Sequence, residues 1–415
     1  MKILLINNYH FRHGGSETVY FNTANLMVEH GHEVIFFSQS RPDNIPCPQQ
    51  DYFSEAIDVN TKGLLSKIKG VKHYFYNGQA LHNLEKLLQT EKPDVAHIHI
   101  FLGGLTVSIL DILKKYNIPI IHSVHEYRMV CPAYTFKNGY NKVCQACKGG
   151  HFWHCLVNKC SKRSRTLSLL MMAEMYYRNT FHHPTNYIDA FVFVSKFSKN
   201  IHLLYDAKFK EKKCFALYNF CNSDVIENKH KYINTYDSYY LYYGRLSYEK
   251  GLNTLIESFK SYPNLKLKIV GTGPIEEDLK QMCRLNRITN IEFLGYKKGK
   301  DLYDLVENAK FVCVPSEWYE NNPMTIIESY SLSTPVIGAE IGGITEIIED
   351  QNTGFLFESG STTSLSNTLS KSNSLTLDEY NEMKINANQF ALNNFDRNQH
   401  YNQLIEIYKM VIANK

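Results

Sequence analysis

Short β-rich runs alternate with turns and helical segments through the second half of the chain, and this alternation constrains the fold more than any other feature. The runs cover residues 239–243, 265–270, 291–294, 311–315 and 335–338. After the first run, Leu252, Leu255 and Phe259 recur at helical spacing. Alternating strands and helices are typical of a parallel sheet covered by helices. The pattern therefore predicts an α/β fold.

The first half repeats the pattern, which predicts a second domain of the same class. Its predicted strands are 3–6, 33–37, 95–99, 118–124 and 190–194. At 415 residues the chain exceeds the ~250–300 residues at which single cores stop growing. Residues 222–238 form the best candidate linker, because they are polar and precede the strand that opens the second half. We therefore expect domains at 1–224 and 225–394 and a closing helix at 395–415.

Composition narrows the class of protein. Hydrophobic residues make up 44% of the chain, charged residues 21%, and the net charge is +4. These values are typical of a globular chain without a charged tail, so we expect no nucleic-acid partner. The first residues contain an apolar run of only four and pass at once into the β/α pattern, and no run approaches the ~20 apolar residues of a membrane span. We expect a cytoplasmic protein.

Two glutamates, Glu320 and Glu328, bracket a predicted helix start. Asn322 is predicted as N-cap and Pro323 as the first helical residue, so the free backbone N–H groups of the next turn would point toward a ligand beside Glu320. Such a helix end suits a diphosphate, and a buried Glu328 could accept hydrogen bonds from a ribose diol. The alternative is a surface helix with two solvated glutamates. The flanking strands at 311–315 and 335–338 favour a ligand site at the carboxyl edge of the sheet.

A second group of residues follows the strand at 239–243. Arg245 and Lys250 flank a strand-to-helix turn, and Gly244 and Gly251 could let the backbone approach a ligand closely. Two cations at such a turn fit a pyrophosphate, although a basic surface loop is the alternative.

Weaker signals lie in three other loops. Gly271 and Gly273 stand between a strand and a predicted helix, and the loop at Tyr296 could lie against a nucleobase. In the first half, Gly14 and Gly15 could let a loop reach a phosphate or an acceptor hydroxyl.

Several ionisable side chains stand at the predicted carboxyl ends of the first-half strands. They are His10, His13, His99, His125 and Glu126. A single histidine is more often structural, but several at one sheet edge favour a site.

Five of the ten cysteines fall within thirty residues, with the spacing C-x12-C-x2-C-x7-C-x4-C. They are Cys131, Cys144, Cys147, Cys155 and Cys160. In a cytosolic chain stable disulfides are not expected. A structural zinc ion held by four thiolates, or by three thiolates with His151 or His154, could order this insertion at about 131–165. Reduced, partly buried thiols and an iron–sulfur cluster are the alternatives.

Basic residues crowd the end of this insertion, ahead of the apolar, helix-like segment 167–177. They are Lys159, Lys162, Arg163 and Arg165. Such a surface could rest on anionic lipid at the inner face of the membrane or on a lipid-diphosphate acceptor. The alternative is a solvated charge cluster beside a packed helix.

The ordered motifs of the second half closely resemble the carboxyl-terminal domain of glycosyltransferase family 4. They are Gly244-Arg245 with Lys250-Gly251, Gly271-Thr272-Gly273-Pro274, Phe293-Leu294-Gly295-Tyr296, Pro315-Ser316 with Glu320 and Glu328, Pro335-Val336-Ile337-Gly338, and Gly342-Gly343 with Glu346. The first half resembles the family more loosely, through Gly14-Gly15-Ser16-Glu17, residues 94–99, His125-Glu126 and Phe193-Val194-Ser195. These enzymes are retaining and independent of metal ions. Their GT-B fold has two Rossmann-like domains facing across a cleft, with a last helix that crosses back to the first domain.

The resemblance implies transfer of a hexose-type sugar from a UDP or GDP sugar to a hydroxyl of a glycan or lipid-linked acceptor, in surface polysaccharide or glycolipid synthesis. Arg245, Lys250 and the helix start would stabilise the leaving diphosphate, Glu320 would contact the sugar and Glu328 the ribose. The residues Asn321, Asn322, Pro323, Met324 and Thr325 would line the donor through backbone groups. His125 could bind a sugar hydroxyl or help with the acceptor proton.

No catalytic cofactor is expected, because the chain lacks an Asp-x-Asp clamp for a divalent ion. The alternatives are a nucleotide-sugar epimerase, a phosphorylase and a non-catalytic nucleotide-sugar-binding protein.

Overall fold

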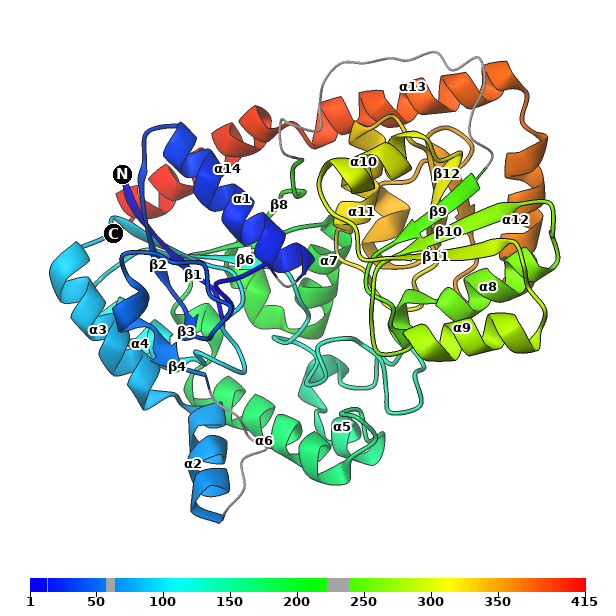
Figure 1. Ribbon diagram of the computed structural model, residues 1–415. Coiled ribbons are helices and arrows are strands. Elements are labelled where there is room, and N and C mark those ends of the chain that lie inside the picture. Colours follow the sequence, from blue (N-terminus) through cyan, green and yellow to red (C-terminus); the bar gives the residue numbers. More distant parts are fainter. Residues whose placement is uncertain (13, 57–63, 222–238) are drawn as a thin grey trace. The chain divides into compact units, whose positions relative to one another are not determined.

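The computed structural model describes residues 1–12, 14–56, 64–221 and 239–415, except for the side chains of 64–68. The chain forms two compact units: the first combines Met1–Leu217 with Asn398–Lys415, and the second is Tyr218–Arg397 (Figure 1). His13 and the predicted linker at 222–238, with its boundary between 224 and 225, lie outside the described residues.

A parallel sheet forms the centre of the first unit. In the described part of the chain its strands run in the order β2 (Glu33–Phe37), β1 (Lys2–Ile6), β5 (Val95–Ile98), β6 (Ile120–Val124), β7 (Ala190–Phe193) and β8 (Lys213–Ala216). A short separate pair joins β3 (Gln39–Ser40) to β4 (Ser54–Glu55). The inner strands are buried along their length, as expected for a sheet with helices on both faces.

The helices of this unit come from the first half of the chain, except for the last helix, α14. They are α1 (Gly15–Glu29), α2 (Leu64–Phe75), α3 (Gly78–Glu91), α4 (Ser108–Lys115), α5 (Trp153–Val157), α6 (Arg165–Phe181), α7 (Lys196–Tyr205) and α14 (Arg397–Ala413). Helices α1 and α14 supply Tyr20, Leu404 and Tyr408 to one core together with Ile3 and Leu5 of β1. The predicted return of the last helix to the first domain is confirmed.

The second unit contains a second parallel sheet. In the described residues its order is β11 (Ile291–Gly295), β10 (Lys266–Val270), β9 (Tyr239–Tyr243), β12 (Phe311–Val314), β13 (Val336–Ala339) and β14 (Gly354–Phe357). The central strand β9 has four tyrosines and Leu241, and it is buried at every position because helices cover both of its faces.

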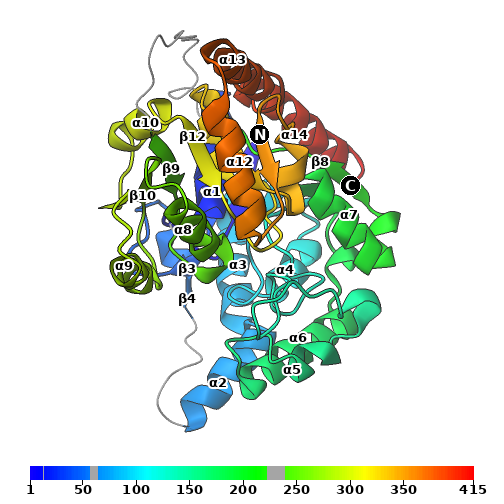
Figure 2. The same ribbon diagram turned by 90° about the vertical axis from the view of Figure 1, so that its right-hand side faces the viewer.

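Two layers of helices enclose this second sheet (Figure 1). One face is covered by α8 (Leu252–Lys260), α9 (Glu276–Leu285) and α12 (Thr362–Ser374), of which α12 packs on α8 (Figure 2). The other is covered by α10 (Lys300–Glu307), α11 (Met324–Ser331) and most of α13 (Leu377–Asn394). Two Rossmann-like domains with all-parallel sheets confirm the predicted fold class.

Within the residues described, no helix combines the length and the apolar character that crossing a bilayer would require.

Candidate functional site

The strand order of the second sheet places a ligand-binding position beside β9. The chain moves outward from β9 to β10 and β11 on one side, then returns to β12, β13 and β14 on the other. Strands β9 and β12 are neighbours at this reversal. In open parallel sheets, ligands bind outside the carboxyl ends of the two strands at such a switch point. The loops that follow β9 and β12 carry Arg245, Lys250 and Glu320.

Backbone hydrogen bonds tie the loops at this edge into one framework. They run from Leu246 N to Thr272 O (3.0 Å), from Glu317 N to Glu249 O (2.8 Å) and from Gly343 N to Glu320 O (2.7 Å). The loops after β9, β10, β12 and β13 are therefore fixed relative to one another.

Glycines are required where these loops touch. Gly251 has φ +69°, and a Cβ there would lie 1.8 Å from the carbonyl oxygen of Pro315. At Gly271, a Cβ would lie 1.9 Å from the carbonyl oxygen of Gly244. A Cβ at Gly273 would meet the backbone of Leu246 at 2.2 Å. At these three glycines the structure shows a close approach of one loop to the next, while their approach to a ligand stays a prediction.

Lys250 and Glu320, seventy residues apart, form an ion pair at this edge. The distance from Lys250 Nζ to Glu320 Oε1 is 2.7 Å, and the ammonium lies 5.3 Å from the centre of the Trp318 ring. Ser316 Oγ also donates to Glu320 Oε1 at 2.7 Å. Burial raises the pKa of Glu320, but the charge of Lys250 and the hydrogen bonds outweigh burial and leave the pKa below its ordinary value. Glu320 is therefore a buried, ionised carboxylate.

The start of α11 differs from the prediction by one residue. The helix begins at Met324, and Pro323, with ψ 119°, is the N-cap rather than the first helical residue. Asn322 does not cap the helix because its side-chain oxygen accepts the backbone N–H of Asn219 at 2.8 Å. The backbone N–H groups of Met324 and Thr325 have no hydrogen-bond partner among the described residues. They are two of the four donors that a helix leaves unsatisfied at its start.

Glu328 lies in the second turn of α11 and is half-buried. Tyr243, the last residue of β9, donates to Glu328 Oε2 at 3.2 Å and to the carbonyl of Thr325 at 2.8 Å. Burial raises the pKa of Glu328 to about 7 despite this hydrogen bond. Tyr243 and Ser316 thus position the two carboxylates, roles that the sequence did not predict. The one available signal for Tyr243 was a tyrosine at the end of the strand that enters the site.

Arg245 and Tyr296 are both exposed at the same sheet edge. The Arg245 side chain makes no hydrogen bond or ion pair with any described residue, although its carbonyl accepts the Tyr242 hydroxyl at 2.8 Å. Tyr296 follows β11 and is 69% exposed. Both side chains are available to a ligand at this edge.

The predicted residues of the first unit stand at the carboxyl ends of its own strands. Gly14 is the N-cap of α1 and Gly15 its first residue. His99 follows β5 and His125 follows β6, and their rings stack with Nδ1 of His99 2.9 Å from Nε2 of His125. His10 lies instead in an aromatic cluster with Tyr20.

Burial lowers the pKa of these histidines. The pKa of His125 falls to about 3, and that of His99 falls well below its ordinary value. Both rings are therefore neutral near pH 7. A neutral His125 can donate or accept a hydrogen bond but cannot act as a cationic acid there.

The five clustered cysteines line a common pocket in the first unit, and all are free thiols. In the described parts of the chain, no three His, Cys, Asp or Glu side chains are already close enough together to hold a metal ion.

Both halves of the chain match models of sugar-transferring enzymes. Residues 13–225 match Glycosyltransferase Family 4, and residues 225–390 match Glycosyl transferases group 1. The uncharacterized 42.6 kDa protein in the cps region of Klebsiella pneumoniae is 24% identical over 361 residues, which cover 84% of this chain and 87% of that protein.

Solved structures share the fold over the whole length. Sucrose-phosphate synthase from Thermosynechococcus elongatus aligns with a TM-score of 0.73 and 16% identity over 100% of both chains. HepE of Anabaena in complex with UDP aligns with a TM-score of 0.65 and 15% identity, covering 99% of this chain and 100% of that chain. At such identities the likeness concerns the fold.

Proposed function

This chain belongs to glycosyltransferase family 4, and from that premise we propose that it transfers a hexose-type sugar from a nucleotide diphosphate sugar to a hydroxyl acceptor, with retention at the anomeric carbon. The Lys250–Glu320 pair beside the unpaired amides of α11 carries the proposal, since it combines a cation, a carboxylate and backbone donors at a sheet switch point.

The cations stabilise the leaving group. Departure of the diphosphate concentrates negative charge on its oxygens, and fixed positive groups at that position lower the barrier. Arg245, Lys250 and the N–H groups of Met324 and Thr325 supply this charge. In other transferases a divalent ion stabilises the negative charge of the leaving group. Here these groups stabilise that charge, so the proposed reaction needs no catalytic cofactor.

The carboxylates bind the two sugars of the donor. Glu328, held by Tyr243, accepts hydrogen bonds from the ribose diol. Glu320 contacts the transferred sugar, while Asn321, Asn322 and Pro323 line its binding site through backbone groups. His125 hydrogen-bonds a hydroxyl of the sugar as a neutral ring, because its low pKa makes it a weak proton acceptor.

The proposed donor nucleotide and acceptor have weaker support than the reaction class, because each rests on a single similar protein. HepE was solved with UDP, which supports a UDP sugar as the first donor to test, with GDP sugars second. The Klebsiella relative in a cps region supports an acceptor that is a growing glycan or a lipid-linked glycan of a surface polysaccharide.

We further propose that the first unit rests on the inner face of a membrane. Helices α5 and α6 expose Trp153, Val157 and Leu169, and the cations Lys162 and Arg165, close to them in sequence, are exposed as well. A surface that combines apolar and basic side chains is suited to anionic lipid, and this segment supplies both kinds. Co-sedimentation with liposomes containing anionic lipid is the test, and equal recovery in the supernatant with and without lipid would contradict the proposal.

Thermal shift with UDP, GDP, ADP and their sugars tests the donor, because a ligand that binds only the folded state raises the melting temperature. One nucleotide should raise the Tm of the wild type. Arg245→Ala should lower turnover by roughly 10²-fold with an unchanged Tm. Arg284→Ala, at a solvent-exposed residue of α9, is the matched control. Full turnover in Arg245→Ala would remove the assigned role.

Product analysis separates transfer from the rival chemistries. A transferase releases the nucleotide in proportion to glycosylated acceptor. Epimerisation or hydrolysis of the donor without acceptor would favour an epimerase, and binding without any conversion would favour a non-catalytic protein.

A further inference from the structure

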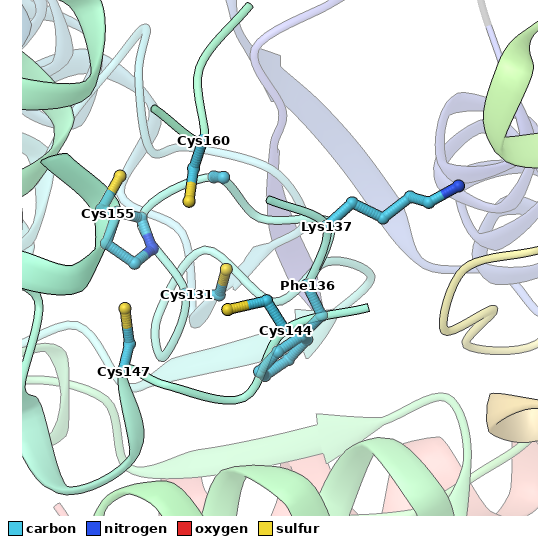
Figure 3. A pocket seen from close by; sticks show the side chains of 9 residues that line it. Cys131, Phe136, Lys137, Cys144, Cys147, Cys155 and Cys160 are labelled. Atoms are coloured by element: carbon cyan, nitrogen blue, oxygen red, sulfur yellow. The ribbon is translucent and has the colours of Figure 1, made fainter. Parts of the chain in front are cut away.

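Five cysteines of the first unit surround one pocket (Figure 3). Its lining is Cys131, Pro132, Ala133, Phe136, Lys137, Cys144, Cys147, Cys155 and Cys160. Half of the cysteines of a 415-residue chain thus meet at one place. All five remain free thiols, and none of them belongs to the proposed donor site.

The thiols come from separate turns of the chain and point inward. Cys131 lies in the loop after β6, Cys144 and Cys147 flank a turn, Cys155 lies in α5, and Cys160 follows that helix. Figure 3 shows their sulfur atoms around a shared space. Cys155 is fully buried, and Cys131 and Cys147 are nearly so. Hydrophobic packing alone does not require five cysteine side chains whose sulfur atoms point toward one another.

Donors from the surrounding chain point at these sulfurs. Cys131 accepts hydrogen bonds from the backbone of Ala133 and Phe136. The backbone of Cys155 donates to Cys147 and that of Gly139 to Cys160, and Asn158 Nδ2 lies 3.7 Å from Cys144 Sγ. These donors fix the positions of the sulfur atoms around the pocket, and sulfur is the ligand that thiophilic metals prefer.

The backbone around the pocket is strained, and its apolar core is small. Non-glycine residues with positive φ include Tyr134, Phe136, Asn141 and Lys159, with φ between 47° and 62°. The buried members of the local core are Cys147, Phe152, Cys155 and Met175. Such conformations are unfavourable for residues with a Cβ and persist where the surroundings enforce them. Small, loop-rich segments of this kind are commonly held by a disulfide or a metal.

We propose that four of these five cysteines ligate a thiophilic metal centre that holds the insertion together. On binding, each ligating thiol releases its proton to water, so that one zinc ion and four thiols give a tetrathiolate complex and four protons. The oxidation state of sulfur does not change.

The chemistry of the site admits a zinc ion or an iron–sulfur cluster, both of which take four thiolates. In zinc sites sulfur lies ~2.3 Å from the metal. Among the described residues no three of these side chains are already close enough together to hold an ion, so the insertion must close further for zinc to bind. An iron–sulfur cluster needs less closure, because its four ligands stand farther apart around several iron atoms. Metal analysis distinguishes the two.

The decisive measurement is the metal content of the full-length protein, purified without oxygen and without chelator from medium containing zinc and iron. We expect zinc in about equimolar amount with the chain, or iron with acid-labile sulfide and visible absorption. Metal-free protein that is well folded and in which all five thiols react with a thiol reagent, or protein in which they are paired as disulfides, would overturn the proposal.

Variants identify the ligands. Cys131→Ala, Cys144→Ala, Cys147→Ala, Cys155→Ala and Cys160→Ala are compared one at a time with Cys47→Ala, a partly exposed cysteine outside the pocket. Four of the five pocket variants should lose metal and the control should retain it. Retention of metal in every pocket variant contradicts the proposal.

Chelation tests the structural role without relying on a variant that fails to fold. Removing metal from the wild type should make residues 131–165 sensitive to limited proteolysis while the thermal shift caused by the nucleotide is kept. Unchanged proteolysis after complete metal removal would exclude a structural role. Because neither metal content nor proteolysis depends on sugar transfer, failure here is distinct from failure of the proposed activity.

Discussion

The two glutamates of the proposed donor site have opposite electrostatic environments. Glu320 is buried beside Lys250, and its pKa lies below the ordinary value. Glu328 is held by the neutral hydroxyl of Tyr243, and burial raises its pKa to about 7. Two carboxylates in one site with pKa values moved apart have different tasks. Glu320 remains charged throughout the neutral range, whereas Glu328 gains and loses its proton within it.

Glu328→Gln should weaken nucleotide binding most at high pH. A carboxylate accepts hydrogen bonds from the ribose diol more strongly than a carboxylic acid, so the affinity of the wild type should rise as pH passes through about 7. The affinity of the variant should be lower and independent of this ionisation. Calorimetric titration between pH 5.5 and 8.5 measures both, with Glu292→Gln, at an exposed residue of β11, as control. Equal affinity of wild type and Glu328→Gln at high pH would contradict the ribose contact.

The stability of the nucleotide-free protein should change in the opposite sense. The pKa of Glu328 is raised from 4.5 in the unfolded chain to about 7 in the fold, so its favourable contribution is full below 4.5 and is lost as pH rises through about 7. Glu328→Gln removes this pH-dependent loss of stability, because a glutamine side chain does not ionise. The Tm difference between variant and wild type should therefore become more positive from pH 5 to pH 8.

Lys250→Met should reduce both turnover and stability. Turnover should fall by roughly 10²-fold because a donor to the diphosphate is lost. The melting temperature should fall because Glu320 is left buried without its cation. The double variant with Glu320→Gln should recover stability but not turnover. A double variant no more stable than Lys250→Met would show that the ion pair does not couple the two residues.

At the scale of elements, the proposed donor site is an assembly of loops whose spacing is set by glycines. The turn before α8 contacts the end of β12 at Gly251 and Pro315. The loop after β13 contacts Glu320 through the backbone of Gly343. Each contact leaves no room for a side chain at the glycine. The absence of a Cβ at Gly251 and Gly343 therefore lets the loop that carries Glu320 pack where it does.

Gly251→Ala should disturb the site more than its size suggests. The residue has φ +69°, which costs an alanine about 1–2 kcal/mol, and the new Cβ would collide with the carbonyl oxygen of Pro315. We expect a lower Tm and a loss of turnover as the loop carrying Glu320 shifts. Gly78→Ala is the control, because a Cβ there meets nothing within 4 Å. A Gly251→Ala protein with the Tm and turnover of the wild type would show that the loop contact is dispensable.

At the scale of the whole molecule, the two units do not simply follow the order of the chain, because the first unit contains both the first half of the chain and its last helix. The last helix, α14, leaves the second unit and completes the core of the first. Tyr408 of α14 bonds His97 of β5 through its hydroxyl at 2.6 Å, and Leu404 lies in the same core. The first unit is therefore incomplete until the residues of α14 have been synthesised.

Leu404→Ala should destabilise the first unit and leave donor binding in the second intact. Large-to-small changes at buried leucines cost about 2–5 kcal/mol. Thermal unfolding should begin at a lower temperature, while the nucleotide still produces a shift. Gln403→Ala, at an exposed neighbour on the same helix, is the control. Equal melting curves for both variants would show that α14 contributes little to the core.

Much of the fold could be read from local pattern. The predicted strands and the closing helix are present with small changes of boundary, because burial on both faces demands continuous apolar runs. The strands β8 and β14 were not predicted from the sequence. Strand β8 is exposed or half-buried throughout, and β14 is four residues long and begins with glycine, so neither shows a clear apolar run. The start of α11 was misplaced because Asn322 bonds a residue 103 positions away.

The sequence by itself determined the alternation of strands and helices, the family and the kinds of side chain at the sheet edge, since each depends on residues close together in the chain. Only the tertiary structure decided that Lys250 pairs with Glu320, that Tyr243 holds Glu328 and that five thiols share one pocket. The physical reason is that these contacts depend on which strands become neighbours and how closely their loops pack, and no local periodicity encodes either.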